Sequence, residues 1–459
     1  MRLRKADLTR RVNGSLALRF ELPGLTSYAG LELVRQYFAA IDLPQRIRRH
    51  LSGKSLATDF GIASLVLLLL GLIITGGRRL RHLLYLQGDP VILRFCGLKR
   101  LPTPRTVGRW LAHFAQRQVE ALLRLNDEVV AEAVRAAGVR RLTIDVDGSV
   151  VSTGQQVAWA QRGFNPHHRK VPSYYPVTAY EAQTGVILRV KNRPGNVHDG
   201  KAGVPFLRAV FSQVEETLGC GYRCEFRMDG AFFRQDVIEL LERRGAEYAV
   251  KVPFFAWVGL KQRIHENRLW QPVDSTVSSF ECRLYLGPWK RWQRVVVYRK
   301  RVQHATAKNF QLDLFDPADG HYEYSAIATN KDLKPPALWH FLCGRGSHEK
   351  AYGELKAGFA FDTVPSQRYG ANSAWQVLSI LAFNLMRGFQ VATTASRRSP
   401  NRKRRTLYGF ETIETLRYQC LHRAGLLVRP EGRSTLDVGT SPPVKRRFAF
   451  IHEGLLRAA

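Results

Sequence analysis

The chain has 459 residues, and 45% of them are apolar, which is enough for two or three domains with cores of their own. Its 70 lysines and arginines outnumber its 38 aspartates and glutamates, so the formal net charge at pH 7 is +32. A charge of this size repels itself unless a polyanion neutralises it, which makes nucleic acid the leading partner and an anionic membrane surface the second.

Residues 1–137 predict a helical region. It begins with MRLRKADLTRR, which is charged and lacks the apolar segment of a signal peptide. Within it, FGIASLVLLLLGLIITGG (residues 60–77) approaches the minimum of about 17 residues for a membrane-spanning helix. One marginal segment does not explain a charge that is spread over the whole chain. We therefore interpret it as a buried helix and expect no stable membrane association.

Residues 101–138 predict one helix, which Thr103 caps and Gly138 ends. Basic side chains recur along it at four-residue steps, at Arg105, Arg109, His113 and Arg117. Such a stripe is typical either of a solvated face or of a helix that contacts DNA, and the sequence leaves both interpretations open. Arg105 and Arg109 are the candidates for DNA contact.

From residue 138 the pattern changes to alternating strands and helices. Strands are expected at residues 141–148, 173–182 and 185–196, followed by a helix at 199–219, a strand at 224–230, a helix at 233–245 and a strand at 246–253. This order predicts an α/β fold with an RNase H-like mixed sheet flanked by helices. Residues 138–253 would form the first part of that core.

A β-rich insertion is expected at residues 254–330, because residues 280–302 alternate like a twisted hairpin. Residues 331–394 predict two helices that complete the core. Residues 395–459 form a basic C-terminal region that contains the run SRRSPNRKRR. Such a run is typical of a solvated linker, which is compatible with phosphate contact.

The strand at residues 141–148, RLTIDVDG, carries two aspartates in an apolar run. Asp145 and Asp147 share one face of the strand because side chains two apart point the same way. A buried carboxylate needs either a cationic partner or a metal ion. Asp147 stands at the carboxyl end of the strand, where an α/β sheet opens its ligand crevice, so we favour it as a ligand and leave Asp145 open between a metal and a basic partner.

Two further acids complete a candidate site. Asp229 ends a later strand in the same way, and Glu349 lies on the predicted helix beyond the insertion. Three such acids can hold two divalent cations, an arrangement suited to cutting or joining phosphodiesters. Oxygen ligands alone favour Mg²⁺ or Mn²⁺, two per site, over zinc.

These segments resemble the DDE transposases of bacterial insertion sequences, in particular the group whose third acid lies in a Y-R-E-K signature. The resemblance rests on VDGSV (residues 146–150), GFNPHHRKVPSYYP (163–176), MDGAFF (228–233), RGSHEKAYGELKAGF (345–359) and NSAWQVLSILAFNLMRGF (372–389). It implies a catalytic core interrupted by a β domain, with Asp147, Asp229 and Glu349 as metal ligands. It also implies that Arg345 and Lys356 contact the transposon-end DNA.

The signature is matched at Arg345, Glu349 and Lys356, but its tyrosine is replaced by Leu342. Tyr352 could supply a phenol, because it shares a predicted helical face with the three matching residues. Another acid, Glu354, falls on the far side of this helix, where we expect a solvated ion pair with Lys350. The segment GFNPHHRK could place His168, Arg169 and Lys170 beside DNA or could form a polar surface loop, and both interpretations stay open.

By resemblance, the chain is expected to bind double-stranded DNA at transposon terminal inverted repeats and at the target, to cut it and to transfer strands. Synapsis of two ends implies a homodimer in the working complex. Six cysteines are too few for a disulfide framework in so long a chain, so we expect reduced thiols and an intracellular protein. Together with the expected DNA partner, this gives a cytoplasmic, nucleoid-associated location. The alternatives are a catalytically inactive DNA-binding protein derived from a transposase and a membrane-anchored basic protein.

Overall fold

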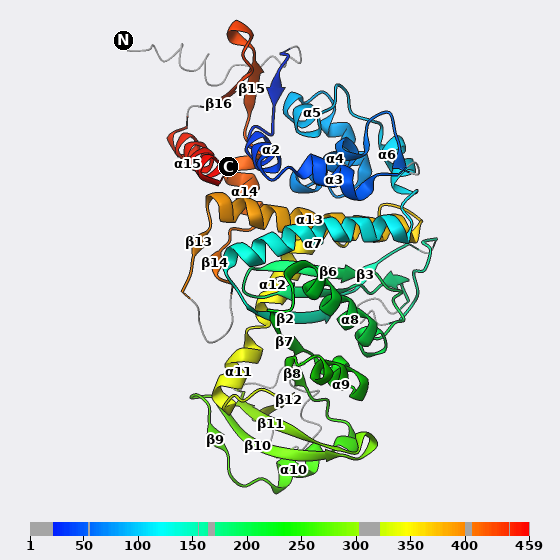
Figure 1. Cartoon of the computed structure of the whole chain (residues 1–459), viewed down its shortest axis with the longest axis vertical. Helices are drawn as coiled ribbons and strands as arrows, with labels where there is room; N and C mark the ends of the chain where they lie inside the picture. Colours follow the sequence, from blue (N-terminus) through cyan, green and yellow to red (C-terminus); the bar gives the residue numbers. More distant parts are fainter. Residues whose placement is uncertain are drawn as a thin grey trace, which may run out of the picture.

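The computed structural model describes residues 22–53, 56–154, 156–163, 170–302, 322–399, 406–439 and 441–458. Figure 1 shows an elongated molecule with helices from the N-terminal and C-terminal parts of the chain at one end, a sheet in the middle and a β ribbon at the other end. The expected α/β class is confirmed.

The helices are α2 (Leu31–Ala40), α3 (Leu43–Leu51), α4 (Ile62–Ile74), α5 (Pro90–Cys96), α6 (Pro104–Leu111), α7 (Gln116–Ala137), α8 (Asp199–Leu218), α9 (Gln235–Arg243), α10 (Leu260–Glu266), α11 (Pro335–Cys343), α12 (Gly346–Phe359), α13 (Tyr369–Thr393), α14 (Ile413–Leu416) and α15 (Pro442–Ala458). Short 3-10 helices are η2 (Leu80–Leu86), η3 (Gly230–Phe232), η4 (Ala256–Val258), η5 (Gly287–Trp289) and η8 (Pro430–Gly432), and η7 (Arg417–Leu421) is a π-helical turn.

The strands are β1 (Leu25–Thr26), β2 (Arg141–Gly148), β3 (Val151–Ser152), β4 (Ser173–Tyr174), β5 (Val177–Glu181), β6 (Val186–Lys191), β7 (Arg223–Met228), β8 (Glu247–Lys251), β9 (Gln271–Pro272), β10 (Val277–Leu286), β11 (Arg291–Arg301), β12 (Tyr322–Thr329), β13 (Ser396–Arg397), β14 (Tyr408–Gly409), β15 (Gly425–Val428) and β16 (Thr435–Val438).

A nine-stranded mixed sheet forms the centre, in the order β6-β5-β2-β7-β8-β12-β11-β10-β9. Strands β2, β7 and β8 run parallel, whereas β5 and β6 form an antiparallel edge beside β2. In chain order these elements are β2, β5, β6, α8, β7, α9 and β8, which is the succession of three strands, a helix, a strand, a helix and a strand that the sequence pattern predicted. The parallel arrangement brings the carboxyl ends of β2 and β7 to the same edge of the sheet.

The β-rich segment extends this sheet, because β12 pairs with β8, with Ala328 opposite Val250. Strands β10 and β11 form the long hairpin expected from the alternation of residues 280–302, paired from Val277 opposite Lys300 to Leu286 opposite Arg291. In Figure 1 this ribbon lies at the end of the molecule farthest from α4 and α5.

Helix α4 lies inside the helical part of the molecule, and its residues from Leu65 to Ile74 are buried. It shares a core with α12 and α13, and α13 also packs on α7 and β6. The interpretation of residues 60–77 as a buried helix is therefore confirmed. In the part of the chain that the structure describes, no helix combines the length and the apolar character needed to cross a membrane.

The single helix expected at residues 101–138 is wrong in one respect, because it is broken into α6 and α7. Thr103 caps α6 by accepting a hydrogen bond from the backbone N–H of Thr106, and Gly138 ends α7 in a left-handed conformation, both as expected. Between them Ala115 is extended, with φ −102° and ψ −178°, and Gln118 accepts a hydrogen bond from its backbone N–H. That local cap starts a new helix, and the apolar periodicity runs across the break without showing it.

Candidate active site

Two of the three predicted acids meet at the carboxyl edge of the sheet. Asp147 lies near the end of β2, and its Oδ1 accepts a hydrogen bond of 3.0 Å from the backbone N–H of Gly148. Asp229 directly follows the neighbouring parallel strand β7 and accepts a 3.0 Å hydrogen bond from the N–H of Ala231. The sheet topology thus brings together two carboxylates that are distant in the sequence.

Asp145 has a different role. It is fully buried, and Arg227 Nε and Nη2 donate to its two carboxylate oxygens at 2.5 and 2.7 Å. Arg227 is its register partner on β7 and also donates to the backbone carbonyl of Phe341 at 2.9 Å. Asp145 is therefore half of a structural ion pair, which answers the question that the sequence left open.

Helix α12 presents the signature residues to Asp147. Arg345, at the N-cap, forms an ion pair of 2.7 Å with Asp147 Oδ2. The Tyr352 hydroxyl donates to the backbone carbonyl of Asp147 at 3.2 Å, and Lys356 Nζ donates to the carbonyl of Val150 at 3.3 Å. The predicted shared face is thus confirmed for these three residues, and a role for the Tyr352 phenol in place of the signature tyrosine stays a prediction.

Glu349 is exposed on α12. Among the described residues, no group of three histidine, cysteine, aspartate or glutamate side chains is close enough to hold a metal ion. The structure therefore brings Asp147 and Asp229 together without completing the three-acid set, and the role of Glu349 stays a prediction.

The solvated pairing expected for Glu354 is wrong. Its carboxylate forms an ion pair of 2.5 Å with Arg387 of α13 and accepts a 2.8 Å hydrogen bond from the N–H of Ile413. The Glu354 and Arg387 side chains are only 13% and 11% exposed, so this acid ties α12 to α13 and α14. Helical spacing predicts a pair between Glu354 and Lys350, which are four residues apart. It takes no account of α13 and α14, which offer Glu354 its actual partners.

The sequence analysis missed Asp199. It is the first residue of α8, is 3% exposed and pairs with the buried Arg193. A Cβ atom at Gly148 would lie only 2.5 Å from Asp199 Oδ1, so this carboxylate packs against the backbone just after Asp147. An aspartate in the first turn of a predicted helix is usually interpreted as a favourable charge at the helix N-terminus, and only the fold places it beside the other acids.

Burial and mutual repulsion disfavour negative charge at this site. Burial raises the pKa of Asp147 to about 6, the Asp229 and Asp199 carboxylates add to the rise, and the Arg345 guanidinium opposes it. Burial likewise raises the pKa of Asp229, again against Arg345. A cation placed between these carboxylates would relieve both effects, and the Arg345 guanidinium already supplies part of that charge.

The donor set fits a hard divalent cation. Carboxylate oxygens are the ligands that Mg²⁺ and Mn²⁺ prefer, and Asp147 and Asp229 offer them at one edge of the sheet. The Arg345 guanidinium lies 2.7 Å from Asp147 Oδ2 and supplies a positive charge where a metal ion would bind this carboxylate.

The remaining candidate DNA contacts are surface residues. Arg105 and Arg109 are exposed on α6, and Lys170 is exposed shortly before β4. His168 and Arg169 lie outside the described residues.

Comparison with known proteins adds the family. The model of the family described as "Transposase DDE domain group 1" matches residues 10–459. No curated protein matches the chain. A solved structure, the cryo-EM structure of the piggyBac transposase synaptic complex with hairpin DNA, is similar over 94% of this chain and 85% of that one, at 10% identity and a TM-score of 0.41. With the match covering nearly every residue and the two aspartates adjacent on the sheet, the chain belongs to the DDE transposases, metal-dependent enzymes that cut DNA and join the cut strands.

Proposed function

We propose that the enzyme acts on the terminal inverted repeats of an insertion sequence, with Asp147, Asp229 and Glu349 as its catalytic acids. The observation that supports this most is the position of Asp147 and Asp229 at the ends of adjacent parallel strands, beneath the α12 face that carries the signature residues. Glu349 is exposed on that helix, one turn after Arg345.

The three carboxylates would hold Mg²⁺ or Mn²⁺, two ions per site. When bound, such ions supply activation of the attacking water or 3′ hydroxyl and stabilisation of the leaving oxygen. The role of the protein is to position the phosphodiester and to balance charge. Asp147 is held by the hydrogen bond from Gly148 and by Arg345, so its orientation is set before DNA arrives.

Arg345 and Lys356 would contact the phosphates at the transposon end. Arg345 pairs with Asp147 on β2, and Lys356 donates to the carbonyl of Val150 just after β2, so both cations lie next to the acids. A DNA phosphate would offer the Arg345 guanidinium a bidentate partner in place of Asp147. DNA docking would thereby leave the Asp147 carboxylate available to hold a divalent ion, so the two binding events would favour each other.

Residues 1–137 would serve in DNA binding and dimerisation, with Arg105 and Arg109 on exposed α6 as phosphate contacts. Lys170, with His168 and Arg169, would contact DNA beside the core. We propose that two copies bring two ends together, that target DNA is captured next to them, and that the basic residues 395–459 add phosphate contacts. Acting on chromosomal DNA would place the protein in the cytoplasm with the nucleoid.

The experiment that tests this function uses a labelled duplex that carries the inverted repeats flanking the coding sequence. We expect cleavage at the repeat ends with Mg²⁺ or Mn²⁺ and none with excess chelator, with binding retained under both conditions. Binding without cleavage under every metal condition would indicate an inactive relative. Absence of both would contradict the proposal.

A further inference from the structure

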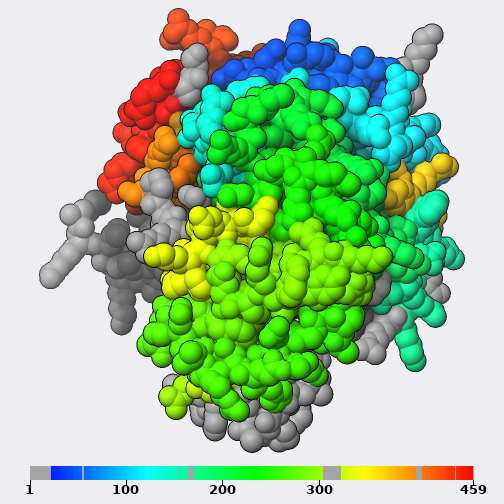
Figure 2. Space-filling view, turned by 60° about the horizontal axis from the view of Figure 1, so that its bottom comes forward, coloured from blue at the N-terminus to red at the C-terminus, as the bar shows by residue number. Residues whose placement is uncertain are grey.

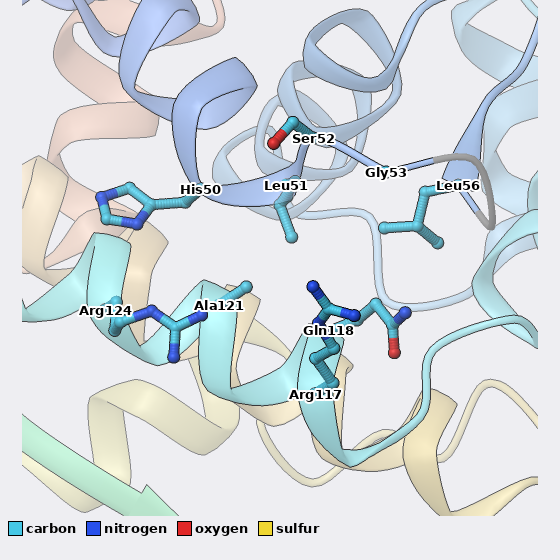
Figure 3. Close-up of a pocket in the computed structure, with 9 residues that line it drawn as sticks. All are labelled: His50, Leu51, Ser52, Gly53, Leu56, Arg117, Gln118, Ala121 and Arg124. Carbon is cyan, nitrogen blue, oxygen red and sulfur yellow. The ribbon is translucent and has the colours of Figure 1, made fainter.

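A basic pocket lies between α3 and α7, away from the acids. It has a volume of about 350 Å³, and its walls are the end of α3 and the residues that follow it on one side and the first half of α7 on the other. Figure 3 shows Arg117 and Arg124 on either side of Ala121 on α7, beneath His50 and Ser52.

The contact between α3 and α7 changes character along its length. Towards the end of α7, acids on that helix contact basic side chains on α3: Arg46 forms an ion pair of 2.6 Å with Glu132, and His50 Nε2 lies 2.9 Å from Glu128 Oε1. These pairs hold the two helices together.

Towards the start of α7 the pocket opens between the two helices, and Arg117 and Arg124 line it from α7. Arg117 and Arg124 are exposed, and within the described ranges neither forms an ion pair or a hydrogen bond. Glu120 lies between them on α7 but outside the pocket lining, and its carboxylate accepts a hydrogen bond from Gln116. The next acid, Asp127, is buried and lies 3.9 Å from Arg189. The pocket thus presents two guanidinium groups with no acid in its lining.

The spacing of the two arginines suits a chain of phosphates. Seven residues of helix separate them, which is about 10 Å along the axis and places both on one side of α7. A guanidinium binds a phosphate through two parallel N–H donors, and the Ser52 hydroxyl and Gln118 side chain add polar groups to the wall. Arg105 and Arg109 are also exposed, on α6, the helix that precedes α7 in the chain.

We propose that this pocket is a seat for the DNA backbone, in which Arg117 and Arg124 each bind a phosphate of the duplex. The proposal rests on the proposed DNA-binding function and adds a site to it. Because the two arginines bind phosphates and not base edges, the pocket would add affinity and fix the position of the protein on the duplex. It would not read the base sequence.

The test measures how DNA affinity depends on salt, with the full chain and chelator present so that no cleavage occurs. A fluorescent duplex is titrated at several salt concentrations with the wild type, Arg117→Gln/Arg124→Gln, and the control Arg208→Gln/Arg243→Gln. The control removes the same charge from two exposed arginines on α8 and α9. Each lost phosphate contact reduces the slope of log affinity against log salt by about 0.9. The pocket variant is expected to lose about two units of slope, and the control much less.

The outcomes separate this site from the function as a whole. A steep slope in the wild type that is unchanged in the pocket variant would overturn the pocket and leave DNA binding standing. A flat slope in the wild type would overturn DNA binding itself. A parallel measurement records the melting temperature with inorganic phosphate, to detect a site for small anions. If phosphate stabilises the wild type but not the pocket variant, while the salt dependence of DNA affinity is the same in both, the assignment of the pocket to DNA is also overturned.

Discussion

Asp145 and Asp147 lie two residues apart on one face of β2, yet their surroundings differ. Asp145 is enclosed by Arg227, whereas the Asp147 side chain is 23% exposed and pairs with Arg345 at the open edge of the sheet. Strand alternation predicted that the two would share a face, and the position of Asp147 near the strand end placed it at the open edge, while its role as a metal ligand stays a prediction. The partner of Asp145 was beyond prediction, because Arg227 is 82 residues away and its place depends on the register of β7.

Asp145→Asn is expected to lower the free energy of unfolding by about 3–5 kcal/mol, because it leaves the buried Arg227 guanidinium without its carboxylate. Asp147→Asn makes the same chemical change two residues away and should cost much less, since burial already disfavours the Asp147 charge. Urea denaturation of both variants measures the difference. Similar losses would contradict the division into a structural and a catalytic aspartate.

The raised pKa of the buried Asp127 predicts that the stability of the protein depends on pH. Burial raises its pKa from 3.8 to about 7, with Arg189 opposing the rise. Between these two values the folded state binds a proton that the unfolded state has lost, so the free energy of unfolding falls as pH rises. The loss is complete above about pH 7 and amounts to at most about 4 kcal/mol, at 1.4 kcal/mol per pKa unit.

Asp127→Asn removes this penalty, so its stability relative to the wild type should increase between about pH 5 and about pH 8. Denaturant titrations at the two pH values provide the measurement, with the exposed Asp59→Asn as the control. A difference between Asp127→Asn and wild type that stays constant with pH would show that Asp127 is ionised in the folded protein throughout.

Among the elements, α12 has two faces with different functions. One carries Arg345, Tyr352 and Lys356 to β2, and the other carries Glu354 to α13. Helical periodicity was sufficient to assign residues to faces. It could not show which neighbours each face meets, and it also missed the break before α7, because a local cap at Ala115 interrupts a continuous apolar pattern.

Glu349→Gln and Glu354→Gln are a matched pair on this helix. We expect Glu349→Gln to eliminate DNA cleavage and to leave the melting temperature unchanged, because the side chain is exposed. Glu354→Gln should lower stability by about 1–3 kcal/mol through its bonds to Arg387 and Ile413, while retaining cleavage per folded molecule. Loss of cleavage only in Glu354→Gln would transfer the catalytic role to that residue.

At the scale of the whole molecule, one sheet links the acids to the β ribbon. The strand that precedes Asp229 pairs with β8, and β8 pairs with β12 of the segment that we expected to be an insertion. The succession of elements was predictable from hydrophobic periodicity. The continuity of the sheet was not, because pairing between β8 and β12 joins segments about 80 residues apart. The place of Asp199 beside Asp147 depends in the same way on the packing of α8.

The central claim is that Asp147 and Asp229 hold the divalent cations that cut DNA. The most direct measurement compares cleavage and binding of the inverted-repeat duplex by the wild type, Asp147→Asn and Asp229→Asn in Mn²⁺, with circular dichroism as the check on folding. We predict that both variants fold and bind the duplex but lose cleavage, because each lacks a carboxylate ligand. Cleavage near the wild-type level in either folded variant would contradict this assignment.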